Sequence, residues 1–394
     1  MQAPPRLPPT PRAEAQAAVQ TAPTRPTEIP ALTGLRALLA WWVVFYHVAD
    51  ADFAEIRLGL LDPLRAHGYL AVDGFFILSG FILAYVYRVR FANPAPGTYF
   101  RFLVARLSRV YPVHIVVLAV IVVLIGSAWL AGFRPRVPER FALDELALQI
   151  TLLHAWGFSR RLAWNYPSWS ISAEWFAYLC FPLVHRLVLR SVSRAWPVVV
   201  AVACLAGLLL LEKLGPNKNL SYTYEFALIR IGCEFTAGAA LLMLARPWLE
   251  AAPRAGKRLR PHATLALLGA FVAIFVAPDA VAVAGLGLVI LFLSHPRDAL
   301  GALLSRPGAL YAGETSYAVY MVHALIEGIG ILALPAVPGL GAIPPVVRFL
   351  GLVVVVQLVA DQAWRRIEKP GRDAGRHLGE AMLARRNPAP GPAA

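Results

Sequence analysis

The chain has 394 residues, of which 58% are hydrophobic and only 15% are charged, and its formal net charge is +14. Soluble globular domains carry about a quarter charged residues, so this composition excludes an ordinary soluble enzyme. The basic residues lie in short segments between apolar stretches, which is typical of membrane-protein loops. We therefore expect a lipid bilayer, and no nucleic acid, as a partner.

The two ends of the chain are rich in Pro and Ala. The N-terminal end lacks the apolar segment of a cleaved signal peptide. We expect residues 1–29 to form a disordered cytoplasmic tail and residues 373–394 to form a cytoplasmic C-terminal tail. Residues 30–372 are then predicted to form one membrane domain.

Ten segments between the tails are apolar enough to be candidate membrane spans, which predicts an all-α polytopic membrane protein. Lys and Arg are enriched in alternate loops, on the side that holds the N-terminus. With an even number of spans, this bias predicts a multi-pass protein of the cell membrane with both termini cytoplasmic. The predicted spans are residues 30–49, 68–88, 110–132, 168–189, 195–212, 222–245, 262–277, 280–294, 309–334 and 346–366.

The first span contains two polar residues, Arg36 and His47, in the stretch LRALLAWWVVFYH. On an α-helix they fall on one face, roughly 16 Å apart along the axis. An Arg within a spanning helix costs roughly 2.5–3.5 kcal/mol on insertion scales, so it usually indicates a functional site. Two alternatives stay open: Arg36 could extend to the cytoplasmic interface, and His47 could simply lie at the outer one.

Three polar residues of other spans are expected at the depth of His47, in the outer half of the membrane: Asp73, Glu174 and His323. Each also has a structural interpretation. Asp73 could cap the N-terminus of its helix, and Glu174 could form a structural ion pair. Tyr317 and His323 could make hydrogen bonds between helices.

These residues belong to motifs that follow one another along the chain. They are LRALLAWWVVFYH, VDGFFILSGF (72–81), ARLSRVYP (105–112), SWSISAEWFAY (168–178), ETSYAVYMVH (314–323) and RRIEKP (365–370). In their order and spacing the chain resembles the acyltransferase family 3 of integral membrane acyltransferases, from about Pro30 to Arg372. The resemblance implies that residues 30–372 are an acyltransferase domain. It would move an acyl group, most commonly acetyl, from cytoplasmic acyl-CoA to a hydroxyl of an extracytoplasmic carbohydrate.

The resemblance also implies roles for individual residues. Arg36 and His47 match the family's R-x10-H pair, whose His is regarded as catalytic. Glu174 matches the Glu of the W-S-x-S-x-E stretch. Arg106 and Arg109 match an R-x-x-R motif associated with the acyl-CoA donor. The S-Y-x-x-Y-x-x-H run matches Ser316, Tyr317, Tyr320 and His323.

General chemistry agrees with this assignment. The phosphates of acyl-CoA require basic partners, and Arg106 and Arg109 present two guanidinium groups on one side of a helix, with Arg101 nearby to assist. These arginines could instead be ordinary positive charges of a cytoplasmic loop. A hydroxyl acceptor needs a base, for which His47 is suited, and Glu174 would hold its tautomer. No metal is expected; direct transfer and an acyl-His intermediate both stay open.

The same residues also bear on whether other classes of function fit this chain. A secondary transporter or sugar flippase would be expected to show midplane sites and internal repeats, and the sequence shows neither. A purely structural or sensory protein leaves the intramembrane Arg, Glu and His unexplained. Within the enzymes, the acceptor could also be a small molecule or a lipid-linked sugar.

Overall fold

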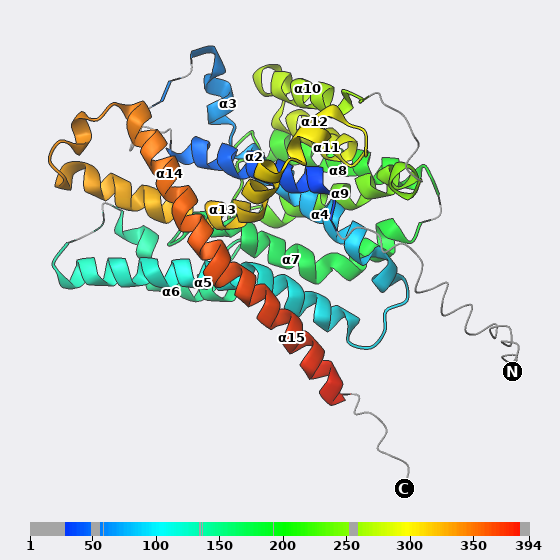
Figure 1. Cartoon of the computed structure of the whole chain (residues 1–394), viewed down its shortest axis with the longest axis horizontal. Coiled ribbons are helices and arrows are strands. Elements are labelled where there is room, and N and C mark those ends of the chain that lie inside the picture. The colour runs from blue at the N-terminus through cyan, green and yellow to red at the C-terminus, as the bar shows by residue number, and fades with distance from the viewer. Residues whose placement is uncertain are drawn as a thin grey trace, which may run out of the picture.

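The computed structural model describes residues 28–48, 56–57, 59–133, 135, 137–191, 193–251 and 259–386, and within them it contains helices and no β-strand. The chain folds as an all-α polytopic membrane protein, as predicted (Figure 1). Most of the predicted tail 1–29, and the last eight residues of the tail 373–394, lie outside the described residues.

Ten apolar helices occupy the ten segments predicted as spans. They are α2 (Pro30–Val48), α4 (Leu70–Ala92), α5 (Thr98–Leu130), α7 (Trp169–Val184), α8 (Trp196–Leu214), α9 (Ala227–Glu250), α10 (His262–Val276), α11 (Asp279–Leu293), α13 (Pro307–Ala336) and α14 (Pro345–Ala363). Among the described residues, seven helices are long and apolar enough to cross a membrane. The helices α10 and α11 are apolar but shorter. The number of crossings and the side of each terminus remain predictions.

Short elements connect these helices. Two are π-helical turns, η4 (His185–Leu189) directly after α7 and η6 (Trp364–Glu368) directly after α14. A last helix, α15 (Lys369–Arg386), follows η6 without a break. The others are η1 (Gly59–Leu61), α3 (Asp62–Ala66), η2 (Pro138–Phe141), α6 (Leu143–Thr151), η3 (Tyr166–Ser168), α12 (Ala299–Leu304) and η5 (Leu340–Ala342).

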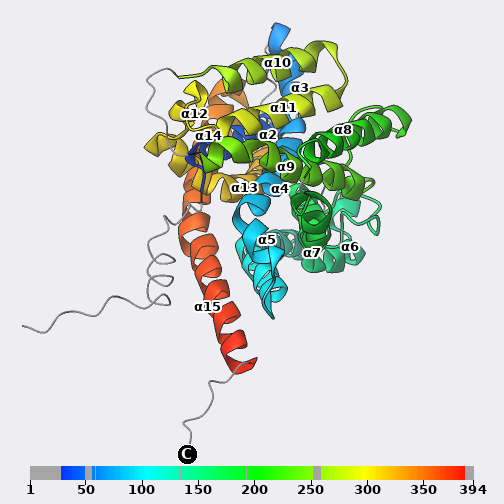
Figure 2. The same cartoon turned by 90° about the vertical axis from the view of Figure 1, so that its right-hand side faces the viewer.

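Two helix boundaries differ from the predicted ones. The helix α5 begins at Thr98, twelve residues before the predicted span 110–132, so that Arg101, Arg106 and Arg109 lie on a helix and not in a loop. The C-terminal helix continues through α15, so residues 373–386 of the predicted tail are helical. In both segments basic residues alternate with apolar ones, which lowers the mean hydropathy but is compatible with a helix that packs on one face. Figures 1 and 2 show α15 running beside α5, against which it packs.

The helix α2 lies at the centre of the bundle, between α4 and α13. The helices α4 and α9 make the most extensive contact, and each contributes a glycine where the backbones meet. A Cβ atom on Gly80 would lie 2.0 Å from the carbonyl oxygen of Phe235, and one on Gly238 would lie 2.0 Å from that of Ile77. Small residues of this kind allow helix backbones to approach closely in a membrane. The helix α4 also packs against α2, where the candidate site lies.

Candidate active site

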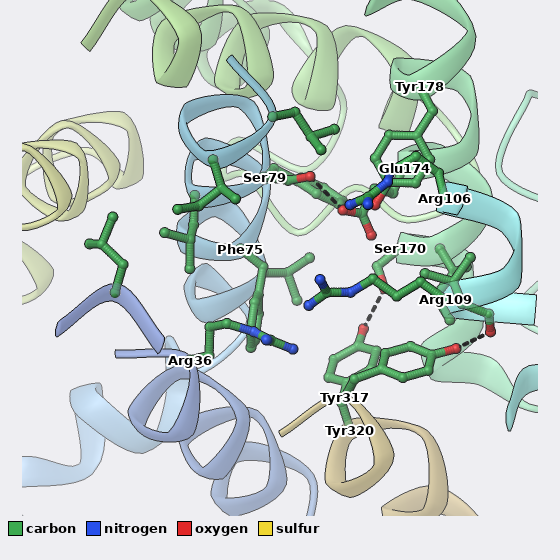
Figure 3. Close-up of a pocket in the computed structure, with 18 of the residues that line it drawn as sticks. Arg36, Phe75, Ser79, Arg106, Arg109, Ser170, Glu174, Tyr178, Tyr317 and Tyr320 are labelled. Atoms are coloured by element: carbon green, nitrogen blue, oxygen red, sulfur yellow. Dashed lines mark hydrogen bonds between the residues drawn. The ribbon is translucent and has the colours of Figure 1, made fainter. Parts of the chain in front are cut away.

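Five helices, α2, α4, α5, α7 and α13, enclose a cavity of about 170 Å³ (Figure 3). Apolar side chains make up much of its wall, and charged and hydroxyl groups converge on it from every one of these helices. The polar lining residues are Glu28, Thr33, Arg36, Ser79, Arg106, Arg109, Ser170, Glu174, Tyr178, Tyr317 and Tyr320.

Three arginines extend into this cavity. Arg106 and Arg109 come from adjacent positions on one face of α5, and Arg36 comes from α2 on the opposite wall (Figure 3). The guanidinium group of Arg106 donates to the hydroxyl of Tyr87 at 3.3 Å and lies 5.4 Å from the centre of that ring. Arg101, the third predicted donor-binding residue, is exposed on α5 and is not part of the cavity wall. The i, i+3 spacing of Arg106 and Arg109 therefore does place two guanidinium groups in one cavity.

Glu174 lies in the same cavity, on α7. Its Oε1 accepts a hydrogen bond of 2.6 Å from Ser79 of α4. Figure 3 shows the carboxylate beside the guanidinium group of Arg106. This carboxylate balances part of the positive charge of the cavity.

His47 lies at the end of α2, outside the wall of this cavity, and its partner is His323 of α13. The Nδ1 atom of His47 and the Nε2 atom of His323 are 3.1 Å apart, and the ring centres are 5.1 Å apart with 22° between the ring planes. The Nδ1 atom of His323 lies 2.7 Å from the carbonyl oxygen of Tyr320, which only a protonated Nδ1 can satisfy. With both rings neutral, His323 Nε2 is then an acceptor and His47 Nδ1 the donor, which leaves the lone pair of His47 on Nε2.

The predicted contact between His47 and Glu174 is absent from the hydrogen bonds of the described residues. The position expected for the carboxylate is taken by the imidazole of His323. Depth along the membrane normal does not say toward which neighbour a side chain points. Glu174 points from α7 toward α4 and α5, whereas His47 points toward α13.

Asp73 does not join the other predicted site residues either. It pairs with the guanidinium group of Arg230 on α9 through two hydrogen bonds, one of 2.8 Å to Oδ1 and one to Oδ2. Arg230 also lies 3.6 Å from Glu234, four residues further along α9, and all three side chains are fully buried. The guanidinium group lies 5.2 Å from the centre of the Trp169 ring. Asp73 caps no helix by a side-chain hydrogen bond, so its place is structural, joining α4 to α9.

The tyrosines of α13 link the cavity to the histidine pair. Tyr317 donates to the carbonyl oxygen of Val110, and the hydroxyl of Tyr320 donates to that of Pro167 at 2.9 Å. Ser170 donates to the Tyr320 hydroxyl at 2.9 Å. Both tyrosines line the cavity while bonding α13 to neighbouring helices, so the two interpretations of these residues are compatible.

Some residues around His47 were not predicted from the sequence. The ring of Tyr166 lies 4.9 Å from that of His47, and its hydroxyl donates to Glu327 at 2.9 Å. Burial and the nearby Glu327 carboxylate raise the pKa of Tyr166 well above its ordinary value, so it stays a hydrogen-bond donor. Ser79 lies within the motif VDGFFILSGF, but a serine in an apolar run does not indicate which residue it will bond.

The sequence comparisons agree with the motifs that meet in this bundle. The model of acyltransferase family 3, described as an acyltransferase domain, matches residues 29–361. The chain belongs to this acyltransferase family. No solved structure gives a significant match to it.

Several curated proteins are similar to this family member. Acyltransferase MdmB of Streptomyces mycarofaciens is 34% identical over 186 residues, which cover 46% of each chain. Peptidoglycan O-acetyltransferase OatA of Listeria monocytogenes is 22% identical over 373 residues, covering 88% of this chain and 56% of OatA. Putative peptidoglycan O-acetyltransferase YrhL of Bacillus subtilis is 24% identical over 374 residues, covering 88% of this chain and 55% of YrhL. The chain thus spans about half the length of the curated relatives it matches.

Proposed function

We propose that the protein is a membrane O-acyltransferase of the cell membrane. It would move an acyl group, in the first instance acetyl, from cytoplasmic acyl-CoA to a hydroxyl of an extracytoplasmic carbohydrate. The observation that carries the proposal is the convergence of Arg36, Arg106 and Arg109 on one cavity, in a chain of this acyltransferase family.

The donor is proposed from the chemistry of that cavity. Arg guanidinium groups bind phosphate through paired, charge-assisted hydrogen bonds, and three such groups match the several phosphate charges of a CoA thioester. The apolar side chains between them, such as Phe75 and Ile82, suit the uncharged pantetheine arm. The thioester would then extend past Ser170 and Tyr320 toward the histidine pair.

The reaction itself is assigned to His47. Its Nε2 would take the proton of the acceptor hydroxyl as the oxygen attacks the thioester carbonyl carbon. A carbon–oxygen bond forms, the carbon–sulfur bond breaks, and the proton is passed to the departing CoA thiolate. His323 would hold His47 in the required tautomer, which is the role first expected of Glu174. Glu174 would instead order the arginines around the donor.

The acceptor class is proposed from the relatives. OatA is a peptidoglycan O-acetyltransferase by its name, and YrhL a putative one, which supports a carbohydrate of the cell surface as acceptor. If the acyl ester is found on a lipid-linked sugar or on a small molecule instead, that molecule is the acceptor.

The test compares ester content of surface glycans, by mass spectrometry, between cells with the wild-type protein and cells with single variants. We expect His47→Ala to abolish the ester while the amount of protein in the membrane is unchanged. Arg106→Ala should chiefly raise the KM for acetyl-CoA in isolated membranes, and Arg101→Ala, which removes an exposed arginine of the same helix, should leave it unchanged. Full ester formation by His47→Ala, or equal KM values for the two arginine variants, would contradict the proposal.

A further inference from the structure

A carboxylate of the RRIEKP motif lies beside the arginines of the cavity. Glu368, the last residue of η6, is only 1% exposed. Within the described part of the chain, neither of its carboxylate oxygens has a hydrogen-bond partner. Its nearest cation is Arg372 on α15, whose Nη1 is 3.8 Å from Oε1. A buried carboxylate without hydrogen bonds is costly, so the surrounding charges must stabilise it.

Those charges come from three different helices. Arg36 of α2, Arg109 of α5 and Arg372 of α15 all interact electrostatically with Glu368, and Glu314 of α13 is a like charge in the same range. Arg36 and Arg109 belong to the cavity wall. Arg372 extends to the surface, with 41% of its side chain exposed, and Arg36 and Arg109 are half-buried, so the group of arginines is partly open to solvent.

The position of Glu368 depends on how closely α15 packs against α5. A Cβ atom on Gly375 would lie 2.2 Å from the Cβ of Ser108, and one on Gly371 would lie 2.7 Å from the Cγ of Pro112. Ser108 and Pro112 flank Arg109 on α5. The missing side chains of the two glycines thus allow α15 to bring Glu368 and Arg372 to the α5 turn that carries the cavity arginines (Figure 2).

We infer that Arg36, Arg109 and Arg372 form a phosphate-binding site in which Glu368 is the internal counter-ion, and that the phosphates of the incoming donor displace it. The inference rests on the proposed function for the identity of the donor and adds Arg372 and Glu368 to its site. A phosphate group satisfies guanidinium groups better than a single carboxylate without hydrogen bonds, because it offers more charge and more acceptor oxygens.

A counter-ion of this kind also affects release of the product. Free CoA keeps all the phosphates of the donor, so arginines without a competing carboxylate would hold it after transfer. Glu368 competes for the same guanidinium groups and lowers the affinity for donor and product alike. Tight binding of both would not speed the reaction, because it stabilises the bound states without stabilising the transition state.

The experiment measures binding of CoA, and separately of inorganic pyrophosphate, to the purified full-length protein in nanodiscs by calorimetry. Glu368→Gln should tighten both ligands by at least about threefold, because removing one like charge has about this effect even at the dielectric constant of water. Arg372→Gln should weaken both by about tenfold, because it removes a charge-assisted hydrogen bond. The matched controls Glu380→Gln and Arg376→Gln change the same charges on the exposed face of α15 and should stay within about twofold of wild type.

The outcomes separate this inference from the proposed function. If wild type binds pyrophosphate but not CoA, the CoA donor is wrong, and the pyrophosphate series alone decides the anion site. If Glu368→Gln leaves both affinities unchanged or weakens them, Glu368 is not a competing counter-ion and the inference is overturned. If Glu368→Gln unfolds, Glu368→Asp, which keeps the charge, must restore folding and wild-type affinity. Failure of Glu368→Asp to restore both also overturns the inference.

Discussion

The hydrogen bond between the two histidines gives the most specific prediction. In His323→Ala, the Nδ1–H group of His47 loses its acceptor at 3.1 Å in a partly buried setting. An unsatisfied buried donor costs about 1–3 kcal/mol. His47 can recover this energy by moving its proton to Nε2 or by rotating, and either change removes the lone pair needed for proton abstraction. The expected loss of rate is therefore about 5- to 150-fold, at 1.36 kcal/mol for each factor of ten.

The assay is the initial rate of transfer of radiolabelled acetyl from acetyl-CoA in isolated membranes, normalised to the amount of protein. His47→Ala should reduce the rate by about 10²- to 10⁴-fold, as expected for loss of a general base. In the double variant, His323→Ala should add little to the effect of His47→Ala, because its role acts through that residue. A full rate in His323→Ala, or independent and multiplying losses in the double variant, would refute the reasoning.

Three further predictions concern stability. Asp73→Ala leaves its arginine partner buried without its principal counter-charge, so it should lower the stability to unfolding by about 3–5 kcal/mol, measured by denaturation in detergent. Gly375→Ala should lower the melting temperature because its Cβ would collide with Ser108 at 2.2 Å, whereas Gly379→Ala, whose nearest neighbour would be 3.9 Å away, should not. Burial lowers the pKa of His154 to about 4, so between pH 6.5 and 4 the unfolded chain binds a proton that the folded chain does not. The free energy of unfolding should then fall as pH falls through this window, by up to about 3 kcal/mol. In His154→Gln the melting temperature should depend less on pH.

The helices could be predicted from the sequence because each is long, apolar and bounded by polar segments. The same signal failed at the start of α5 and at α15. There, basic residues on the surface and in the cavity wall lower the mean hydropathy, while residues such as Phe102 and Gly375 face a neighbouring helix. A hydropathy reading averages over the faces of a helix and cannot separate a basic loop from a helix with one basic side.

The sequence indicated which residues lie at the candidate site better than it indicated which of them are in contact. The spacing of Arg106 and Arg109 determined that they share a face, because that relation is local to one helix. The partners of His47 and Asp73 depend on how separate helices are rotated about their axes. The depth of a side chain in the membrane gives no information on that rotation. His47 and Glu174 were therefore expected at the same depth but do not form a hydrogen bond.

The π-helical turn η6 determines which deletions the C-terminal region can tolerate. Its hydrogen bonds run from residue i to residue i+5, so it holds one residue more than an α-helical turn, and deleting one residue between positions 364 and 368 would leave a regular α-helical turn. Gly371 and Gly375 would then still face α5. A deletion at position 369 or 370, within α15, would instead rotate everything after it by roughly 100° and turn both glycines away from α5. A one-residue deletion within η6 should therefore be less damaging than one directly after it.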